Sequence, residues 1–248
     1  MIYYEKYGGS FDRTIVFLHN ETAVHCFSKQ YDYLARNYCV IVPHLPGFGR
    51  NASNMFSTEQ AINEVVELIE SLGKKVTLIG FGLGASLCLP LICRHGELFN
   101  GSIMISPWLI KDMESIERAM KAQADKEKVI KNKLLSGISG LAMGLDKDER
   151  KAHGEFCKNI NMNSLMAAID NGIRYEDYPE YTDIKMPMLA LCGLKEDIEV
   201  RKSVRTLSMQ NINCAYEMWD GAVQNIPYKF DKRLNKAIDD FIEKIYTK

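Results

Sequence analysis

An uncharged stretch, residues 76–93, constrains the fold more than any other part of the chain. It begins with a largely apolar run, Val76–Phe81, and continues from Leu83 as an apolar helical pattern. Three glycines at alternate positions mark the change between the two patterns. The stretch approaches the length of a membrane-spanning helix, but these glycines and Pro90 interrupt it. We therefore predict a buried strand, a tight turn and a buried helix.

Strand-like and helix-like segments alternate along most of the chain. The expected strands are 2–7, 14–19, 38–43, 75–81, 101–106, 188–192 and 214–219, and the expected helices are 27–36, 58–72, 83–94, 200–209 and 231–246. Apolar strands separated by helices predict a mostly parallel sheet covered on both faces. Ser57 and Gln60 are a candidate capping box for the second helix, and Pro90 is expected to kink or shorten the third.

One long region departs from this alternation. Between Trp108 and Asp183 the patterns are helical, with a charged stretch at Lys111–Lys133 that we interpret as a solvated helix face. A Gly-Ser segment, Ser136–Gly144, precedes a further helical pattern near Asn163–Asn171. We predict a helical cap inserted into a core domain, with the cap at 108–183 and the core at 1–107 and 184–248.

Composition excludes several classes of partner. The 248 residues are 46% apolar, which is enough for one large core, and the net charge of −1 gives no sign of a nucleic-acid partner. The seven cysteines, an odd number, indicate free thiols and a cytoplasmic location. No secretion signal is evident at the start of the sequence. We expect no membrane partner, no cofactor and no metal ion, and the oligomeric state is left open.

Four segments, in chain order, resemble the characteristic turns of the α/β-hydrolase superfamily. Phe17–Asn20 resembles its His-Gly turn, and Val42–Gly49 its Asp-x-Pro-Gly-x-Gly turn, with His44 in place of the aspartate. Gly80–Gly84 resembles the G-x-S-x-G nucleophile elbow, and Asp220–Pro227 the Gly-x-Gly-His loop. The resemblance covers nearly the whole chain and implies an α/β-hydrolase fold with a helical cap. It does not by itself imply activity.

The resemblance places the nucleophile and the acid of a catalytic triad. The nucleophile position, normally serine, is Gly82. The acid lies three residues beyond Gly193, which is Glu196, with Asp197 as a one-residue alternative.

The histidine position depends on how the last loop is anchored. Aligning Phe241 with the family's terminal phenylalanine places the histidine at Gln224, whereas anchoring on Gly221 places it at Ala222. We prefer Gln224. No histidine occupies either position.

These substitutions remove the chemistry of acyl transfer. A serine hydrolase needs a hydroxyl, a base and a carboxylate that orients the base. Gly82 offers no hydroxyl, and Gln224 can hydrogen-bond to Glu196 but cannot accept a proton near neutral pH. The backbone N–H groups of Leu83 and Asn20 need no particular side chain. They therefore imply a surviving pocket for a carbonyl or carboxylate oxygen.

Other reactive residue types have simpler interpretations. His19 is expected to pack at a strand end. His25 and His44 are expected near one sheet edge, where a metal or base role stays open although no ligand spacing supports it. Ser86 lies one turn too far along its helix to attack a substrate, and Cys88, like Cys93, is expected to pack in the core.

We therefore predict a pseudoenzyme with a degenerate triad that binds a small molecule or a partner under the cap. The expected ligand-binding residues are Asn20, Leu83, Trp108, Glu196 and Gln224, with Trp108 as either a pocket aromatic or a cap anchor. The alternative is a hydrolase or lyase that uses a non-standard site with Glu196 or His44.

Overall fold

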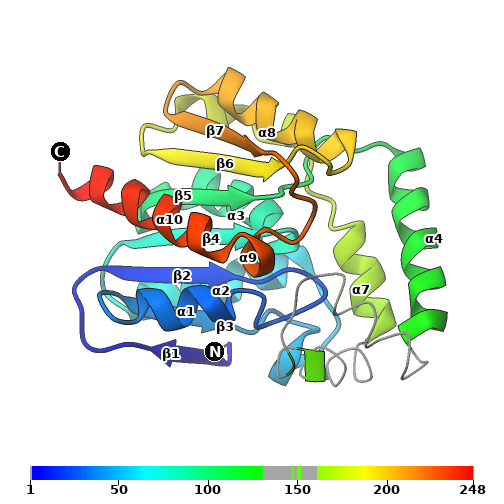
Figure 1. The fold of residues 1–248 in the computed structure, drawn as a ribbon, viewed down its shortest axis with the longest axis horizontal. Helices are drawn as coiled ribbons and strands as arrows, with labels where there is room; N and C mark the ends of the chain where they lie inside the picture. The colour runs from blue at the N-terminus through cyan, green and yellow to red at the C-terminus, as the bar shows by residue number, and fades with distance from the viewer. Residues whose placement is uncertain (1, 131–146, 148–149, 152–160, 248) are drawn as a thin grey trace.

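A computed structural model of the chain describes residues 2–130, 147, 150–151 and 161–247, with side chains up to residue 125 in the first range. Seven strands form one sheet in the order β1-β3-β2-β4-β5-β6-β7 (Figure 1). They are β1 Tyr4–Tyr7, β2 Thr14–Leu18, β3 Cys39–Pro43, β4 Val76–Phe81, β5 Phe99–Ile105, β6 Met188–Gly193 and β7 Cys214–Trp219. Strand β1 is antiparallel to β3, and every other pair is parallel. The predicted mostly parallel sheet is confirmed.

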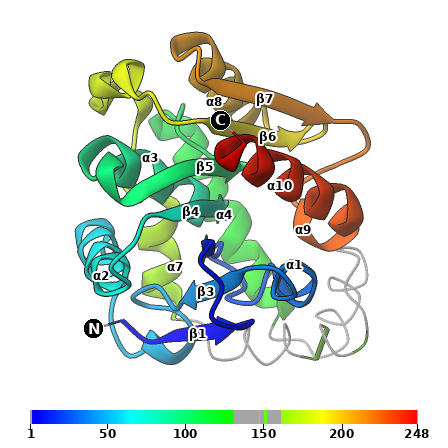
Figure 2. The same ribbon diagram turned by 90° about the vertical axis from the view of Figure 1, so that its left-hand side faces the viewer.

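Burial follows from the apolar composition of the strands. Every residue of β2, β3, β4 and β6 is buried, because helices cover both faces of the sheet. Figure 2 shows α2 and α3 on one side and α1, α9 and α10 on the other. The helices are α1 Ser28–Leu34, α2 Thr58–Ser71, α3 Leu83–Arg94, α8 Ile198–Gln210, α9 Ile226–Lys229 and α10 Asp231–Tyr246. Alternate strand residues pack into one of two apolar clusters, one on each face.

Two local predictions need correction. Helix α3 continues through Pro90 to Arg94, so proline does not shorten it, and the kink that was the other expected effect stays a prediction. The capping box at α2 is only half formed, because Ser57 Oγ accepts a hydrogen bond from the Gln60 N–H at 3.5 Å while the Gln60 amide donates to Glu64 at 2.9 Å.

Between β5 and β6 every described element of secondary structure is helical, as predicted. Helices α4 (Met113–Ile130) and α7 (Met162–Ile169) lie beyond the carboxyl ends of the parallel strands (Figure 1). Short 3-10 helices follow at Tyr175–Asp177 and Pro179–Asp183, and Tyr181 of the second is buried in the core. The division into cap and core remains a prediction, and the Gly-Ser segment 136–144 lies outside the described residues. No helix in the described ranges is both long and apolar enough to cross a membrane.

Candidate ligand site at the strand–helix turn

The turn between β4 and α3 has the strained backbone of a nucleophile elbow. Gly82 has φ 55° and ψ −113°, a left-handed conformation that a residue with a side chain adopts at a cost of about 1–3 kcal/mol. The flanking glycines are required by close packing. A Cβ atom at Gly80 would lie 2.3 Å from the Gly84 carbonyl oxygen, and one at Gly84 would lie 2.1 Å from that of Leu18. All three glycines therefore have a structural reason.

The space where a nucleophile would stand is filled by Glu21. A Cβ atom built on Gly82 would lie 3.1 Å from Glu21 Oε2. The same oxygen accepts a hydrogen bond from the Leu83 N–H at 3.3 Å. Glu21 lies in the loop after β2. Its neighbour Asn20 forms an isolated antiparallel bridge with Ala23 in the same loop. Glu21 was not among the predicted site residues, and its one sequence signal is its position next to Asn20, a predicted oxyanion donor.

Gln224 also faces the elbow. Its side-chain nitrogen lies 3.6 Å from the Cβ position built on Gly82. Ala222, the alternative for the histidine position, is buried, and its carbonyl oxygen lies 2.2 Å from a Cβ built on Gly193. The geometry therefore brings Gln224, rather than Ala222, to Gly82.

Glu196 is buried but turned toward other partners. Its Oε1 accepts hydrogen bonds from Ser106 Oγ at 2.8 Å and from the Gly193 N–H at 2.7 Å. Burial raises the pKa of Glu196 to about 7, against the opposing effect of these two hydrogen bonds. No hydrogen bond joins Glu196 to Gln224 among the described residues, although the Gln224 amide is able to form one. Asp197, the alternative acid, is exposed at the start of α8.

A buried amine lies in the segment between β5 and α4. Lys111 is 8% exposed, and its Nζ lies 2.8 Å from Asn171 Oδ1 and 5.0 Å from the centre of the Trp108 ring. Burial and the neighbouring Arg174 lower the pKa of Lys111 to about 7, although Asp170 and Glu21 oppose this shift. The interpretation of 111–133 as a solvated helix face is therefore wrong at its first residue.

The side chain of Ser86 hydrogen-bonds to the backbone of Trp108. Ser86 Oγ donates to the Trp108 carbonyl at 3.3 Å and accepts from its N–H at 3.2 Å. Ser86 is buried, which agrees with its packing interpretation. Cys88 is also buried, and burial raises the pKa of its thiol to about 12. Neither side chain is placed as a relocated nucleophile.

His19 is structural, as expected. It is fully buried, its Nδ1 lies 2.7 Å from the Asn20 carbonyl, and its Nε2 accepts from the Leu45 N–H at 3.0 Å. These contacts fix one neutral tautomer, and burial lowers the pKa of His19 to about 3.

His25 and His44 do meet at the β1 edge, around Glu5. Their ligand-type atoms all lie within 4.8 Å of one another, an arrangement that suits a metal ion. However, the Arg50 N–H donates to His44 Nδ1 at 3.0 Å, so the ring proton of neutral His44 is on Nε2, which lies 3.1 Å from Glu5 Oε1. A metal ligand needs a lone pair at that nitrogen. The arrangement of Glu5, His25 and His44 therefore suits a hydrogen-bond network better than a metal centre.

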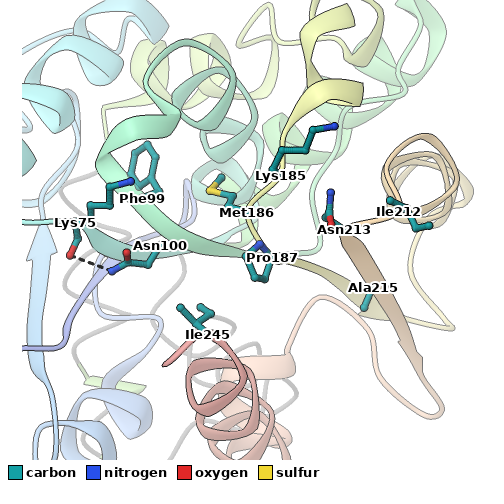
Figure 3. A pocket seen from close by; sticks show the side chains of 10 residues that line it. All are labelled: Lys75, Phe99, Asn100, Lys185, Met186, Pro187, Ile212, Asn213, Ala215 and Ile245. Atoms are coloured by element: carbon teal, nitrogen blue, oxygen red, sulfur yellow. Dashed lines mark hydrogen bonds between the residues drawn. The ribbon is translucent and has the colours of Figure 1, made fainter. Parts of the chain in front are cut away.

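A separate hollow lies at the opposite end of the strands (Figure 3). It has a volume of about 630 Å³ and opens beside the amino-terminal ends of β5 and β7. Its lining residues are Lys75, Phe99, Asn100, Lys185, Met186, Pro187, Ile212, Asn213, Ala215 and Ile245. None of the predicted site residues is among them, so this hollow is not the pocket that the elbow implies.

Comparison with known proteins identifies a matching family and several structural neighbours. The family model described as the alpha/beta hydrolase family matches residues 15–202. The structure is similar to an enol-lactonase from Burkholderia xenovorans, with a TM-score of 0.79 and 17% identity over 97% of this chain and 96% of the other. It is also similar to an esterase from Exiguobacterium antarcticum (TM-score 0.80, 14% identity, 98% and 95% coverage). A bromoperoxidase from Bacillus anthracis gives a TM-score of 0.78 at 17% identity, with 98% and 95% coverage.

No curated protein sequence is significantly similar to the chain. At these identities the structural neighbours establish the fold alone. Together with the sheet order, they confirm the predicted α/β-hydrolase fold.

Proposed function

The chain belongs to the alpha/beta hydrolase family, and we propose that it is a noncatalytic member that binds a small molecule at the elbow, under the cap. The observation that carries this proposal is the occupancy around Gly82. The Glu21 carboxylate lies where a nucleophile side chain at position 82 would stand, and Gln224, at the position of the catalytic base, turns its amide toward the same place. Neither a carboxylate held by a backbone N–H nor an amide can deliver the activated hydroxyl that acyl transfer requires.

The acid position supports the same conclusion. In a triad the carboxylate orients the base, whereas Glu196 is hydrogen-bonded to Ser106 and to the backbone of Gly193. Glu196 therefore stabilises the loop between β6 and α8 through these two hydrogen bonds. A degenerate triad of Gly82, Glu196 and Gln224 is accordingly part of the proposal.

The experiment is an activity test combined with a ligand search. Purified protein is incubated with p-nitrophenyl butyrate and, separately, with a fluorophosphonate probe, and native mass spectrometry is used to look for a co-purified small molecule. We expect no turnover above background, no covalent adduct and a bound ligand. Turnover that persists through repurification and disappears on mutation of one elbow residue would overturn the proposal.

A second candidate function is an enzyme with a non-standard site. It is favoured by two buried groups, Lys111 and Glu196, because the pKa of each lies at about 7, where a general acid or base works best. Activity on any substrate that is lost in both Lys111→Met and Glu196→Gln, while each variant keeps its fold, would support this alternative.

We further propose a reducing, cytoplasmic environment for the protein. The six cysteines of the described residues are all free thiols, and most are buried. Mass spectrometry of alkylated protein purified without reductant tests this, with unpaired thiols as the expected result.

A further inference from the structure

The hollow of Figure 3 lies at the amino-terminal edge of the sheet, away from the elbow. It is bounded by the segments that enter β4, β5, β6 and β7 and by the last turn of α10. Its volume of about 630 Å³ falls in the range of pockets that hold a small organic molecule, about 300–1,000 Å³. The proposed function leaves this space without a role.

The floor of the hollow is apolar. Phe99 is 2% exposed, and Met186, Pro187 and Ile245 are half-buried. Ile245, on α10, packs closely against the sheet because residue 101 is glycine. A Cβ atom built on Gly101 would lie 2.7 Å from Ile245 Cδ1. An apolar group bound in the hollow would therefore meet apolar side chains from both the sheet and α10.

The apolar surface continues onto one wall, at the start of β7. Ile212 is 99% exposed, and Ala215 is exposed as well. A single exposed apolar residue is ordinary. Here Ile212 and Ala215 line the same hollow as the apolar floor, so they extend the apolar surface that a ligand would remove from water.

The polar groups of the hollow are held in place by the protein. Asn213 Nδ2 donates to the Ile184 carbonyl at 3.0 Å. Asn100 Nδ2 donates to the Lys75 carbonyl at 3.3 Å (dashed in Figure 3) and to Tyr246 Oη at 2.9 Å. A ligand would not have to order these two amides, which reduces the entropic cost of binding.

The charge of the hollow has one sign. Its charged lining residues are Lys75 and Lys185, and no carboxylate is among the described residues that line it. Neither lysine forms an ion pair in the described part of the chain. Figure 3 shows Lys75 beside Phe99 and Lys185 beside Met186. The two lysines therefore attract an anionic group to the apolar floor and repel a cationic one.

We propose that the hollow binds a small amphipathic anion, a molecule whose apolar body covers the floor and whose carboxylate or phosphate group pairs with Lys75 or Lys185. The apolar surface supplies the contact area, and the lysines select the sign of the charge. The hollow contains no residue of the elbow, so this site is additional to the one in the proposed function.

Titrations followed in ¹⁵N NMR spectra through the backbone amide signal of Asn213 test the proposal. The anionic probes are 2-naphthoate and 2-naphthyl phosphate. The controls are the neutral 2-naphthamide, the cation 2-naphthylmethylammonium and acetate, which has the charge without the apolar body. We expect at least one anionic probe to shift the signal saturably, and the neutral amide to bind about tenfold more weakly. Acetate and the cation should leave the signal unchanged.

The two anionic probes distinguish the ligand chemistry. Binding of naphthoate alone indicates a carboxylate ligand, and binding of naphthyl phosphate alone indicates a phosphate ester. Binding of neither would overturn the proposal, as would equal binding of the amide, the cation or acetate.

A filling variant tests the place of binding. Ala215→Trp puts a large side chain into the hollow from an exposed strand position, and it should abolish the shift of the Asn213 signal. Tyr216→Trp is the matched control, because Tyr216 is 52% exposed on the opposite side of β7 and does not line the hollow. It should bind the anions as wild type does. Circular dichroism checks folding, and Ala215→Leu serves if Ala215→Trp does not fold. Unchanged binding in a folded filling variant would overturn the proposal.

A charge variant tests the role of the lysines. Lys75→Gln with Lys185→Gln should weaken binding of the anions about tenfold and leave binding of the neutral amide unchanged. The control is Lys202→Gln with Lys232→Gln, which removes two exposed charges outside the hollow and should change neither. Equal anion affinity in the two double variants would show that the lysines do not select the ligand, and would overturn the proposal.

The outcome is separable from the proposed function. Failure of both anionic probes to bind overturns this inference and leaves the proposed binding at the elbow standing. Ester turnover by the wild type overturns the proposed function, whatever the titrations show.

Discussion

The carboxylate of Glu196 lies 2.8 Å from the hydroxyl of Ser106, and both residues are buried. Ser106 directly follows β5 and has φ 54°, a left-handed conformation that is unusual for a residue with a side chain. The hydrogen bond therefore joins a strained turn after β5 to the loop after β6. In this chain the acid of the predicted triad stabilises the carboxyl edge of the sheet.

Glu196→Gln should change how stability depends on pH. Burial raises the pKa of Glu196 from its ordinary value of 4.5 to about 7 in the folded protein, so the folded state binds more protons between these values. Its contribution is complete below about pH 4.5 and is lost as pH rises through about 7. Glutamine stays neutral and can still accept both hydrogen bonds. We expect the variant to be more stable than wild type at pH 8 by about 2–3 kcal/mol, measured by urea unfolding.

The control for this prediction is Glu67→Gln, which removes an exposed carboxylate on α2 and leaves the surroundings of Glu196 unchanged. It should leave the pH dependence unchanged. If Glu196→Gln instead lowers stability equally at pH 5 and pH 8, the ionised carboxylate is needed in the fold and the argument from burial is wrong.

Lys111→Met should alter the pH dependence in the opposite direction. The pKa of Lys111 is lowered to about 7, so the unfolded chain binds more protons between about pH 7 and 10.5. Wild-type stability from this group therefore rises with pH above 7. The charged groups that act on Lys111 are Arg174, Asp170 and Glu21. Methionine keeps the apolar stem without the charge, and we expect the rise between pH 7 and 9 to disappear.

The readout is the urea midpoint measured at pH 6, 7, 8 and 9. Lys185→Met is the matched control and should retain the rise, because Lys185 lies beside the hollow of Figure 3, at the opposite end of the strands. A rise that survives in Lys111→Met would show that another group causes it.

Gly82→Ala should destabilise the fold through both strain and crowding. The left-handed φ alone costs a residue with a side chain about 1–3 kcal/mol. The new Cβ would also lie 3.1 Å from the Asn20 Cβ and 3.1 Å from Glu21 Oε2. Gly172→Ala provides the comparison, because Gly172 has φ +72° with nothing within 4 Å. We expect the larger loss of unfolding free energy for Gly82→Ala, and equal losses would mean that the elbow has room for a side chain.

The sequence predicted the sheet because its evidence is local. Each strand is a short apolar run, and the glycine turn at the end of β4 is visible in the printed residues. The positions of Glu21 and Lys111 depend on contacts between distant segments. Glu21 meets Leu83 across 62 positions, and Lys111 meets Asn171 across 60. Loop side chains have no periodicity that reveals their direction, so neither residue was predicted at the site.

The histidine position shows an intermediate case. The sequence pattern favours Gln224 but also fits Ala222, since a shift of two residues in the final loop changes little in it. The structure distinguishes them through packing, because Ala222 lies against Gly193 while Gln224 approaches Gly82. The role of these positions still requires a functional test.

Rebuilding a triad provides that test, and Glu21 decides its outcome. Gly82→Ser with Gln224→His restores a hydroxyl and an imidazole, but the Glu21 carboxylate still occupies the attack space and the Leu83 N–H. We expect no labelling of this double variant by a fluorophosphonate probe. Adding Glu21→Ala frees both the space and the oxyanion donor, so weak labelling at position 82 should then appear. It should stay weak, because Glu196 is hydrogen-bonded to Ser106 and does not orient the new imidazole.

Two comparison variants make this rebuilding decisive. Replacing Gln224→His by Ala222→His in the triple variant should abolish labelling, because position 222 packs against Gly193 and not the elbow. Keeping Gln224→His and Gly82→Ser but substituting Glu67→Ala for Glu21→Ala should also give none, since Glu67 is exposed on α2. Labelling of the double variant with Glu21 intact would show that this carboxylate leaves the Leu83 N–H readily, and it would remove Glu21 as the group that closes the site.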